Sequence, residues 1–257
     1  MSVPVAPAQV SMDSLTADIG FVFLRPGRVP LRLVYAGGFP PRPGALTMAP
    51  TPASSNAVIG PVRWRWQPHV AGVAAQPLAH AWLAAQLGIG HAALALGRDH
   101  RGRPRLGRVH AGYDCNWSHS GGGLLLALGA GVRVGVDLEV ARPRPHALGL
   151  AERYFTAPEA RWLAGLPQAD HEHAFLRLWC AKEAVLKAHG HGLSFGLHRL
   201  RFESRDGSLQ LAACAAALGP VGDWSLREFE PAAGYLAALA WRRMPDGAPS
   251  DDPQERP

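Results

Sequence analysis

The residues of this sequence best suited to chemistry lie between His173 and Leu193, a stretch with the composition of a helix. Glu183 and Lys187 are four residues apart, so a helix places them one above the other on the same face. A carboxylate and an ammonium that point the same way can act together on a phosphate group. The alternative is a surface salt bridge, which would contribute little to stability.

Lysine usage points to the same stretch. Of the 26 Lys and Arg residues, only Lys182 and Lys187 are lysine. Arginine keeps its proton near neutral pH, whereas lysine can release it. This choice favours a site that needs a transferable proton rather than charge alone.

Two further carboxylates lie on a predicted strand at residues 132–140. Apolar residues alternate there with Arg133, Gly135, Asp137 and Glu139, which is typical of a half-buried strand. Asp137 and Glu139 therefore share one face, roughly 6–7 Å apart along the strand. Such a pair can bind a hard cation such as Mg²⁺, which keeps sites for water and phosphate oxygens. A solvated strand face is the alternative.

A polar segment, N-W-S-H-S-G-G-G at residues 116–123, opens onto a predicted buried strand in the apolar run 124–128. Ser118 and His119 offer a hydroxyl and an imidazole, and the glycines offer backbone N–H groups, to an anion. An ordinary polar turn with a hydrogen-bonded histidine fits equally well. The G-x-S-x-G pattern of serine hydrolases is absent from this segment.

The elements that must position these residues follow from periodicity and turn signals. Besides the central helix, helices are predicted at 78–87, 148–155 and 157–166, with a capping box of Thr156 and Glu159 starting the last. Residues 37–60 are predicted to be loop. Strands are predicted at 19–24, 31–36, 94–106, 132–140, 200–203, 209–213, 224–229 and 235–242.

Composition limits the class of protein. The sequence has no apolar run of the roughly 18 residues that a membrane span needs, and its N-terminus lacks the pattern of a signal peptide. Its three cysteines are too few, and odd in number, for a disulfide framework. We therefore expect a cytoplasmic protein that does not enter a membrane, and we expect a monomer.

Charge is distributed unevenly along the chain. Residues 1–110 carry 11 arginines against three aspartates, a balance of +8, whereas residues 111–257 sum to −2. A basic first half suggests an anionic ligand or partner. Nucleic acid is not expected, because the sequence contains no nucleic-acid-binding motif or zinc-ligand spacing.

Three motifs in order, N-W-S-H-S-G, G-V-D-L-E and F-L-R-L-W-C-A-K-E-A-V-L-K-A-H-G-H-G-L, resemble the 4′-phosphopantetheinyl transferases. The likeness covers about residues 90–243. Within that family, the sequence is most similar to the long, two-lobed, surfactin-synthetase-activating type, which serves carrier proteins of secondary metabolism. It implies an α+β fold of two similar lobes in a pseudo-twofold arrangement, with the active site in the cleft between them.

The resemblance also implies domain limits. We expect a flexible N-terminus at 1–14, an N-terminal lobe at 15–130, a C-terminal lobe at 131–243 and a flexible tail at 244–257. The implied reaction moves phosphopantetheine from coenzyme A to a serine of an acyl or peptidyl carrier domain. It depends on Mg²⁺ and releases adenosine 3′,5′-bisphosphate. Carriers of nonribosomal peptide, polyketide and fatty-acid synthesis are all open as acceptors.

The resemblance assigns roles by motif position. The carboxylates of Asp137, Glu139 and Glu183 are expected to hold Mg²⁺, with Glu183 and Lys187 catalytic. The expected coenzyme-binding residues are Ser118, His119 near the 3′-phosphate, Arg103 and Pro104 at the adenine, and Lys187 at the reacting phosphates.

The first lobe departs from the family pattern, which has a basic stretch that clamps the 3′-phosphate. Arg63, Arg65 and His80 are candidates here, but none aligns with it. Two alternatives therefore stay open. One is a coenzyme A-binding or carrier-docking protein without turnover, and the other is a different Mg²⁺-dependent phosphohydrolase.

Overall fold

The computed structural model describes residues 55–244. The chain divides into two units, 1–50 and 51–257, and the described residues all belong to the second. The strands predicted at 19–24 and 31–36, most of the predicted loop and both chain ends fall outside the described residues. No helix within 55–244 is long and apolar enough to cross a membrane.

The first sheet has the strand order β1-β2-β6-β5, with antiparallel neighbours throughout. Its strands are β1 (Ser55–Ile59), β2 (Val62–Pro68), β5 (Tyr113–Ser120) and β6 (Gly123–Ala130). Helix α2 (Gln76–Leu87) covers one face, where Leu124, Leu126 and Leu128 of β6 pack against Trp82 and Leu83.

The second sheet has the order β10-β11-β7 and is also antiparallel. Its strands are β7 (Val132–Val140), β10 (Ser225–Phe229) and β11 (Tyr235–Arg243). Helix α5 (His171–His189) lies against β7 and β11. The remaining elements are helices α3 (Ala147–Tyr154) and α4 (Ala157–Ala164) and the hairpin of β8 (Leu200–Arg205) and β9 (Ser208–Cys214).

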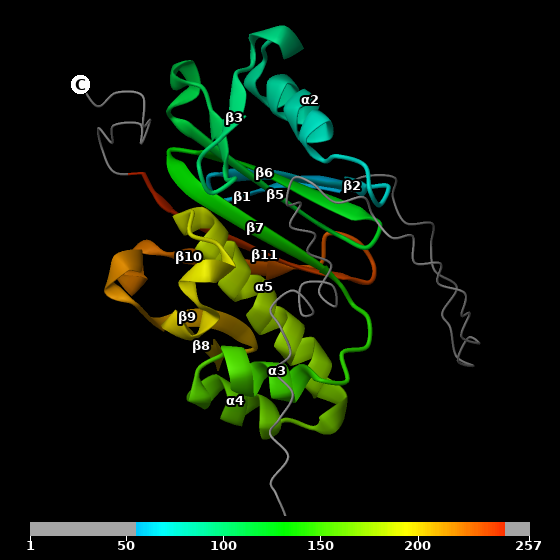
Figure 1. The fold of residues 1–257 in the computed structure, drawn as a ribbon, viewed down its shortest axis with the longest axis vertical. Coiled ribbons are helices and arrows are strands. Elements are labelled where there is room, and N and C mark those ends of the chain that lie inside the picture. Colours follow the sequence, from blue (N-terminus) through cyan, green and yellow to red (C-terminus); the bar gives the residue numbers. More distant parts are fainter. Residues whose placement is uncertain (1–54, 245–257) are drawn as a thin grey trace, which may run out of the picture. The chain divides into compact units, whose positions relative to one another are not determined.

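The two sheets share one apolar core. Val134, Val136 and Leu138 of β7 pack with Trp64 and Leu125 of the first sheet, and all five are buried. Helices α2 and α5 lie on opposite sides of the paired sheets (Figure 1). Each sheet therefore carries a helix on the face turned away from the other sheet, in a mixed α and β fold.

Most predicted elements are present within a few residues of their expected limits, including the Thr156–Glu159 capping box. Three predictions were wrong. The polar turn considered for 116–123 is mostly strand, because residues 116–120 belong to β5 and pair with β6, and only Gly121 and Gly122 turn the chain. Residues 55–59, expected to be loop, form a strand because they pair with β2. The single strand predicted at 94–106 is a hairpin of β3 (Leu96–Arg98) and β4 (Pro104–Leu106), because Asp99 accepts hydrogen bonds from the backbone N–H groups of Arg101 and Arg103 and closes a turn.

Candidate active site

Helix α5 reaches the acidic strand through a close backbone contact at Gly135. A Cβ atom there would overlap the carbonyl oxygen of Ala184 and the amide nitrogen of Ala188, so a larger residue would force the helix away. The helix is buried against the strand along much of its length. This contact brings Glu183 and Lys187 to the face of β7 that carries Asp137 and Glu139.

Lys187, Asp137 and Ser118 form a compact polar group at this contact. The Lys187 Nζ atom lies 2.6 Å from Asp137 Oδ1 and 3.1 Å from Ser118 Oγ. The Ser118 hydroxyl donates to the same Asp137 oxygen over 2.9 Å. The structure therefore brings together residues from three separate motifs of the sequence.

Both surface alternatives from the sequence are excluded by burial. Asp137 is fully buried, and Glu139 and Glu183 are each only 1% exposed. Neither the strand face nor the carboxylate of Glu183 is in solvent. Burying charge without partners is unfavourable, so this arrangement has to be explained by its partners or by a ligand.

Glu139 has two polar partners that the sequence did not suggest. Its Oε2 atom accepts a hydrogen bond from the Ser120 hydroxyl at 3.1 Å and lies 3.3 Å from an Arg144 guanidinium nitrogen. Burial, helped by the nearby Asp137 charge, still raises the pKa of Glu139 to about 8.

The negative charge of Glu183 has fewer partners than that of Glu139. Burial raises its pKa to about 8, although the Lys187 charge acts in the opposite direction. Burial also lowers the pKa of Lys187, but Asp137, Glu183 and Glu139 outweigh that effect and raise it above its ordinary value. Lys187 is therefore a charged ammonium held among carboxylates.

The acidic cluster offers oxygen donors that fit Mg²⁺. Asp137 Oδ2 and Glu183 Oε1 are buried and have no hydrogen-bond partner within 55–244. Unpaired carboxylate oxygens are the ligands that Mg²⁺ prefers. In the part of the chain described, however, no three His, Cys, Asp or Glu side chains are gathered closely enough to hold a metal. The three-carboxylate magnesium site therefore stays a prediction.

Strand β5 holds β7 through side chains rather than through backbone pairing. The backbone N–H groups of Val134, Val136 and Val140 donate to Asp114 Oδ2 at 2.8 Å, Asn116 Oδ1 at 3.1 Å and Ser120 Oγ at 3.2 Å. Alternate residues of β5 point to the same face, so these polar side chains can satisfy the free edge of β7. The polar residues at every second position of 114–120 were a visible signal that the sequence reasoning missed.

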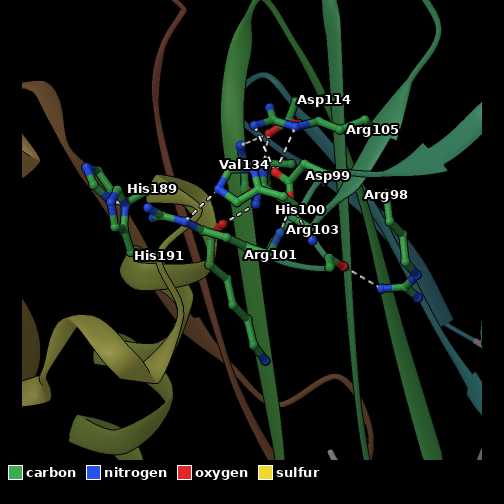
Figure 2. A network of polar contacts seen from close by, with 12 residues as sticks. Arg98, Asp99, His100, Arg101, Arg103, Arg105, Asp114, Val134, His189 and His191 are labelled. Atoms are coloured by element: carbon green, nitrogen blue, oxygen red, sulfur yellow. Dashed lines mark hydrogen bonds and ion pairs between the residues drawn. The ribbon is translucent and has the colours of Figure 1, made fainter. Parts of the chain in front are cut away.

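Arg103 lies in a polar network that joins four elements (Figure 2). Its buried guanidinium pairs with Asp114 and donates to the carbonyl oxygens of Lys187 and Val134. It therefore fixes the turn that precedes β4 to β5, to β7 and to the last turn of α5. The placement of Arg103 and Pro104 at an adenine base stays a prediction, and the contacts of this guanidinium are with the protein itself.

The two lysines of α5 have separate environments. Lys182 is fully buried, 2.8 Å from Glu159 Oε2 of α4, and donates to the Leu197 carbonyl at 3.0 Å. Burial lowers its pKa to about 8, and Glu159 opposes that shift. Lys182 therefore connects α5 to α4, while Lys187 belongs to the carboxylate cluster.

His119 lies on the opposite face of β5 from Ser118. Its ring is tilted against that of His69, with the ring centroids 5.5 Å apart. Burial, followed by the charges of His69 and Lys187, lowers its pKa. His69 was not identified from the sequence, because its proximity to His119 depends on the pairing of β2 and β5 through β6.

The candidate 3′-phosphate residues that precede β3 are partly engaged by the protein. Arg63 donates to the Gln86 carbonyl at 3.1 Å, and the Nε2 atom of His80 lies 3.0 Å from the Leu94 carbonyl oxygen. Arg65 shares the helix-covered face of the sheet with Arg63, since alternate strand residues point the same way. Their role at a 3′-phosphate stays a prediction.

Fold and site together define a mixed α and β protein with a buried group of carboxylates and one ammonium, an arrangement suited to phosphate chemistry. Residues 133–240 match the model of the 4′-phosphopantetheinyl transferase superfamily. The matched region contains β7, α5 and β11, the elements that carry the carboxylates and Lys187 or pack against them.

Individual relatives agree with the family match. The 4′-phosphopantetheinyl transferase HetI of Nostoc sp. is 32% identical over 160 residues, 62% of this chain and 65% of the relative. A Bacillus pumilus 4′-phosphopantetheinyl transferase is 36% identical over 96 residues, 37% of this chain and 40% of its own length. A Synechocystis sp. relative is 42% identical over 85 residues, 33% of this chain and 35% of its own length. The matches thus span about a third to two thirds of these relatives.

Proposed function

We propose that this chain transfers the 4′-phosphopantetheine group of coenzyme A to a serine hydroxyl of an apo carrier protein, releasing adenosine 3′,5′-bisphosphate. The observation that carries this proposal is the buried cluster of Asp137, Glu139, Glu183 and Lys187, inside the region that matches the superfamily. Such a cluster can bind a pyrophosphate together with a hard cation.

The reaction needs a hydroxyl to attack phosphorus while a phosphoanhydride bond breaks. A new serine O–P bond forms, the serine proton leaves, and the departing phosphate gains negative charge. Lys187 is placed to stabilise that charge, because its ammonium is already held at 2.6 Å from Asp137. Glu183, whose Oε1 has no hydrogen-bond partner within 55–244, is placed to accept the serine proton directly or through water.

Asp137, Glu139 and Glu183 would hold Mg²⁺, which would neutralise charge on the pyrophosphate oxygens. The residues around them keep these carboxylates in place. Ser118 donates to Asp137, whereas Ser120 and Arg144 contact Glu139. Arg103 adds contacts with Asp114 and with the backbone of Lys187 and Val134. These contacts orient the cluster before the substrate arrives, so the active site does not have to reorganise during the reaction.

We also propose the long two-lobed type, with similar lobes at 15–130 and 131–243. The support is that each sheet carries one helix on its outer face, and that the proposed boundary falls between β6 and β7. Carriers of secondary metabolism are the proposed acceptors. The cytoplasmic location and the monomeric state stay predictions.

The test is to incubate the protein with coenzyme A, Mg²⁺ and a panel of apo carriers, and to weigh the carriers by mass spectrometry. We expect at least one carrier to gain one phosphopantetheine, and Glu183→Gln to abolish the gain. Coenzyme A binding without any modified carrier would indicate a binding protein instead. Nucleotide release without a carrier would indicate a hydrolase.

A further inference from the structure

Helix α5 ends at two histidines whose rings are hydrogen-bonded to each other. The Nδ1 atoms of His189 and His191 lie 2.6 Å apart, and the ring centroids are 4.3 Å apart (Figure 2). The Nε2 atom of His189 lies 2.9 Å from the carbonyl oxygen of Ala217. Because His189 is the last residue of α5, these contacts join the end of the helix to the segment that follows β9.

The positions of the protons on this histidine pair follow from the Ala217 carbonyl. A carbonyl oxygen can only accept a hydrogen bond, so the Nε2 atom of His189 carries a proton. The neutral ring of His189 then has its lone pair at Nδ1, and the Nδ1 atom of His191 has to be the donor. The neutral pair therefore needs a different tautomer for each ring.

The pair cannot hold both rings in the protonated form. In two imidazolium rings both Nδ1 atoms are donors, and two N–H groups would face each other across 2.6 Å. Other basic groups act on the pair as well. His100 and Arg101 of the β3–β4 turn and Arg242 of β11 carry or can carry positive charge, and each disfavours a further proton.

The pKa values of both histidines are lowered in the folded protein. Burial is the largest cause for each ring, and the neighbouring basic groups add to it. The Ala217 carbonyl and the negative end of the α5 dipole favour a proton on His189 but do not outweigh burial. A lowered pKa means that the neutral pair stabilises the fold above the ordinary histidine value of 6.5, and that this contribution is lost as the pH falls below it.

The end of α5 is also the part of the helix that places Lys187. Lys187 lies two residues before His189, and its carbonyl accepts a hydrogen bond from Arg103. The Gly190 N–H closes the last turn by donating to the Leu186 carbonyl at 2.9 Å. The last turn is therefore fixed at Lys187 by Arg103 and at His189 by the histidine pair.

A metal ion is the other explanation for two neighbouring imidazoles, and the geometry argues against it. Each Zn–N bond is about 2.0–2.1 Å long, so Nδ1 atoms 2.6 Å apart leave no room for an ion between them. A zinc site also takes at least three protein ligands. Within 55–244 no three His, Cys, Asp or Glu side chains are gathered for a metal.

We propose that His189 and His191 are positioning residues that form a pH-sensitive latch on α5. The neutral pair holds the last turn of the helix, and with it Lys187, and the pair releases this turn in acid. The effect on catalysis rests on the proposed function, because it takes Lys187 to act in transfer. The latch itself depends only on the fold, so it can be measured without substrate.

The test compares two variants of the latch with the wild type. His191→Asn keeps a latch that does not titrate, because its amide can donate to neutral His189 or, turned over, accept from protonated His189. His191→Ala has no latch at any pH. The control is His198→Asn, at an exposed histidine in the same connection between α5 and β8.

The kcat for carrier modification is measured for each variant relative to the wild type at the same pH, so that the titration of other groups cancels. At about pH 8 we expect His191→Asn to match the wild type and His191→Ala to be roughly three- to tenfold slower, the scale of one net hydrogen bond. At about pH 5 the wild type should have lost the same factor, so that His191→Ala matches it and His191→Asn exceeds it. His198→Asn should match the wild type throughout.

Ratios that do not change with pH for either His191 variant would overturn the latch and leave the transferase proposal intact. A wild type that modifies no carrier would overturn the transferase proposal alone, and hydrogen exchange at the Gly190 amide then decides the latch. Its protection must fall between about pH 8 and about pH 5 in the wild type and persist in His191→Asn, and equal protection at both pH values in the wild type would overturn the latch.

Nitrogen NMR of the wild type tests the tautomers directly, including the case in which the variants do not fold. At about pH 8 the proton must be on Nε2 in His189 and on Nδ1 in His191. The same tautomer in both rings would refute the latch.

Discussion

At the scale of single residues, charge compensation distinguishes the candidate site. Three buried carboxylates share the ammonium of Lys187, and Arg144 contacts Glu139. Glu183 and Glu139 both have a pKa raised to about 8 mainly by burial, which shows that the protein alone does not fully compensate their charge. A cluster of this kind is more useful for binding a cation and a polyphosphate than for stabilising the fold.

Lys187 is expected to act on the reacting phosphate. Lys187→Ala should lose at least about a hundredfold in kcat, the scale of a lost charge stabiliser. Lys187→Arg should fall between Lys187→Ala and the wild type, because it keeps charge but changes geometry and holds its proton. Single-turnover transfer measures the effect, and circular dichroism confirms folding. A fully active Lys187→Ala would exclude the proposed role.

Asp137 and Glu139 are expected to differ in importance. Asp137→Ala removes the carboxylate that contacts both Lys187 and Ser118, and should abolish Mg²⁺-dependent transfer. Glu139→Ala should be milder, because Ser120 and Arg144 already use part of its hydrogen-bonding capacity. Titration of activity with Mg²⁺ compares the two variants. Wild-type rates for Asp137→Ala at ordinary Mg²⁺ would contradict the metal assignment.

At the scale of elements, the site depends on two contacts of β7. On its face the strand meets α5 at Gly135, where the helix backbone leaves no room for a side chain. On its edge it is held by Asp114, Asn116 and Ser120 of β5. The first contact sets the distance of Glu183 and Lys187 from β7, and the second sets the position of Asp137 along β5.

Gly135→Ala should therefore separate α5 from β7. We expect a loss of about 1–3 kcal/mol of unfolding free energy, the scale of overpacking a core, and a larger relative loss of activity. Gly149→Ala is the matched control, because a Cβ atom there meets no neighbour within 4 Å and alanine favours the helix that contains it. Urea unfolding measures both, and equal stability of the two variants would contradict the close contact.

Asn116→Ala should weaken the edge of β7. It leaves the buried N–H of Val136 without its acceptor, which costs about 1–3 kcal/mol. Hydrogen exchange should show faster exchange at Val136 than in the wild type. The Val134 amide, which donates its hydrogen bond to Asp114 and is not touched by the substitution, serves as the internal reference. Unchanged protection at Val136 would mean that this hydrogen bond does not hold the strand.

At the scale of the whole molecule, charge is expected to guide the carrier protein. Residues 1–110 carry a balance of +8, and carrier proteins are expected to be acidic. The KM for the carrier should rise with salt more than the KM for coenzyme A, because exposed charges are screened within about 10 Å at roughly 0.1 M salt. Initial rates at several salt concentrations test this, and a salt-independent carrier KM would indicate apolar docking.

The sequence alone determined the local geometry and the chemical groups. Alternation over 132–140 placed Asp137 and Glu139 on one face, and the composition of 173–189 indicated the helix that carries Glu183 and Lys187. Both follow from backbone periodicity, which depends only on neighbouring residues. The order of the three motifs was enough to suggest the superfamily, and residues 133–240 match its model.

The tertiary structure alone decided which groups meet. Both lysines of α5 looked alike in sequence, but only Lys187 faces the acidic strand, while Lys182 is paired with Glu159. The contacts of Ser120 with Glu139 and of His69 with His119 join residues from separate strands. Local periodicity carries no information about such pairs, because they arise only when the sheets and helices pack against one another.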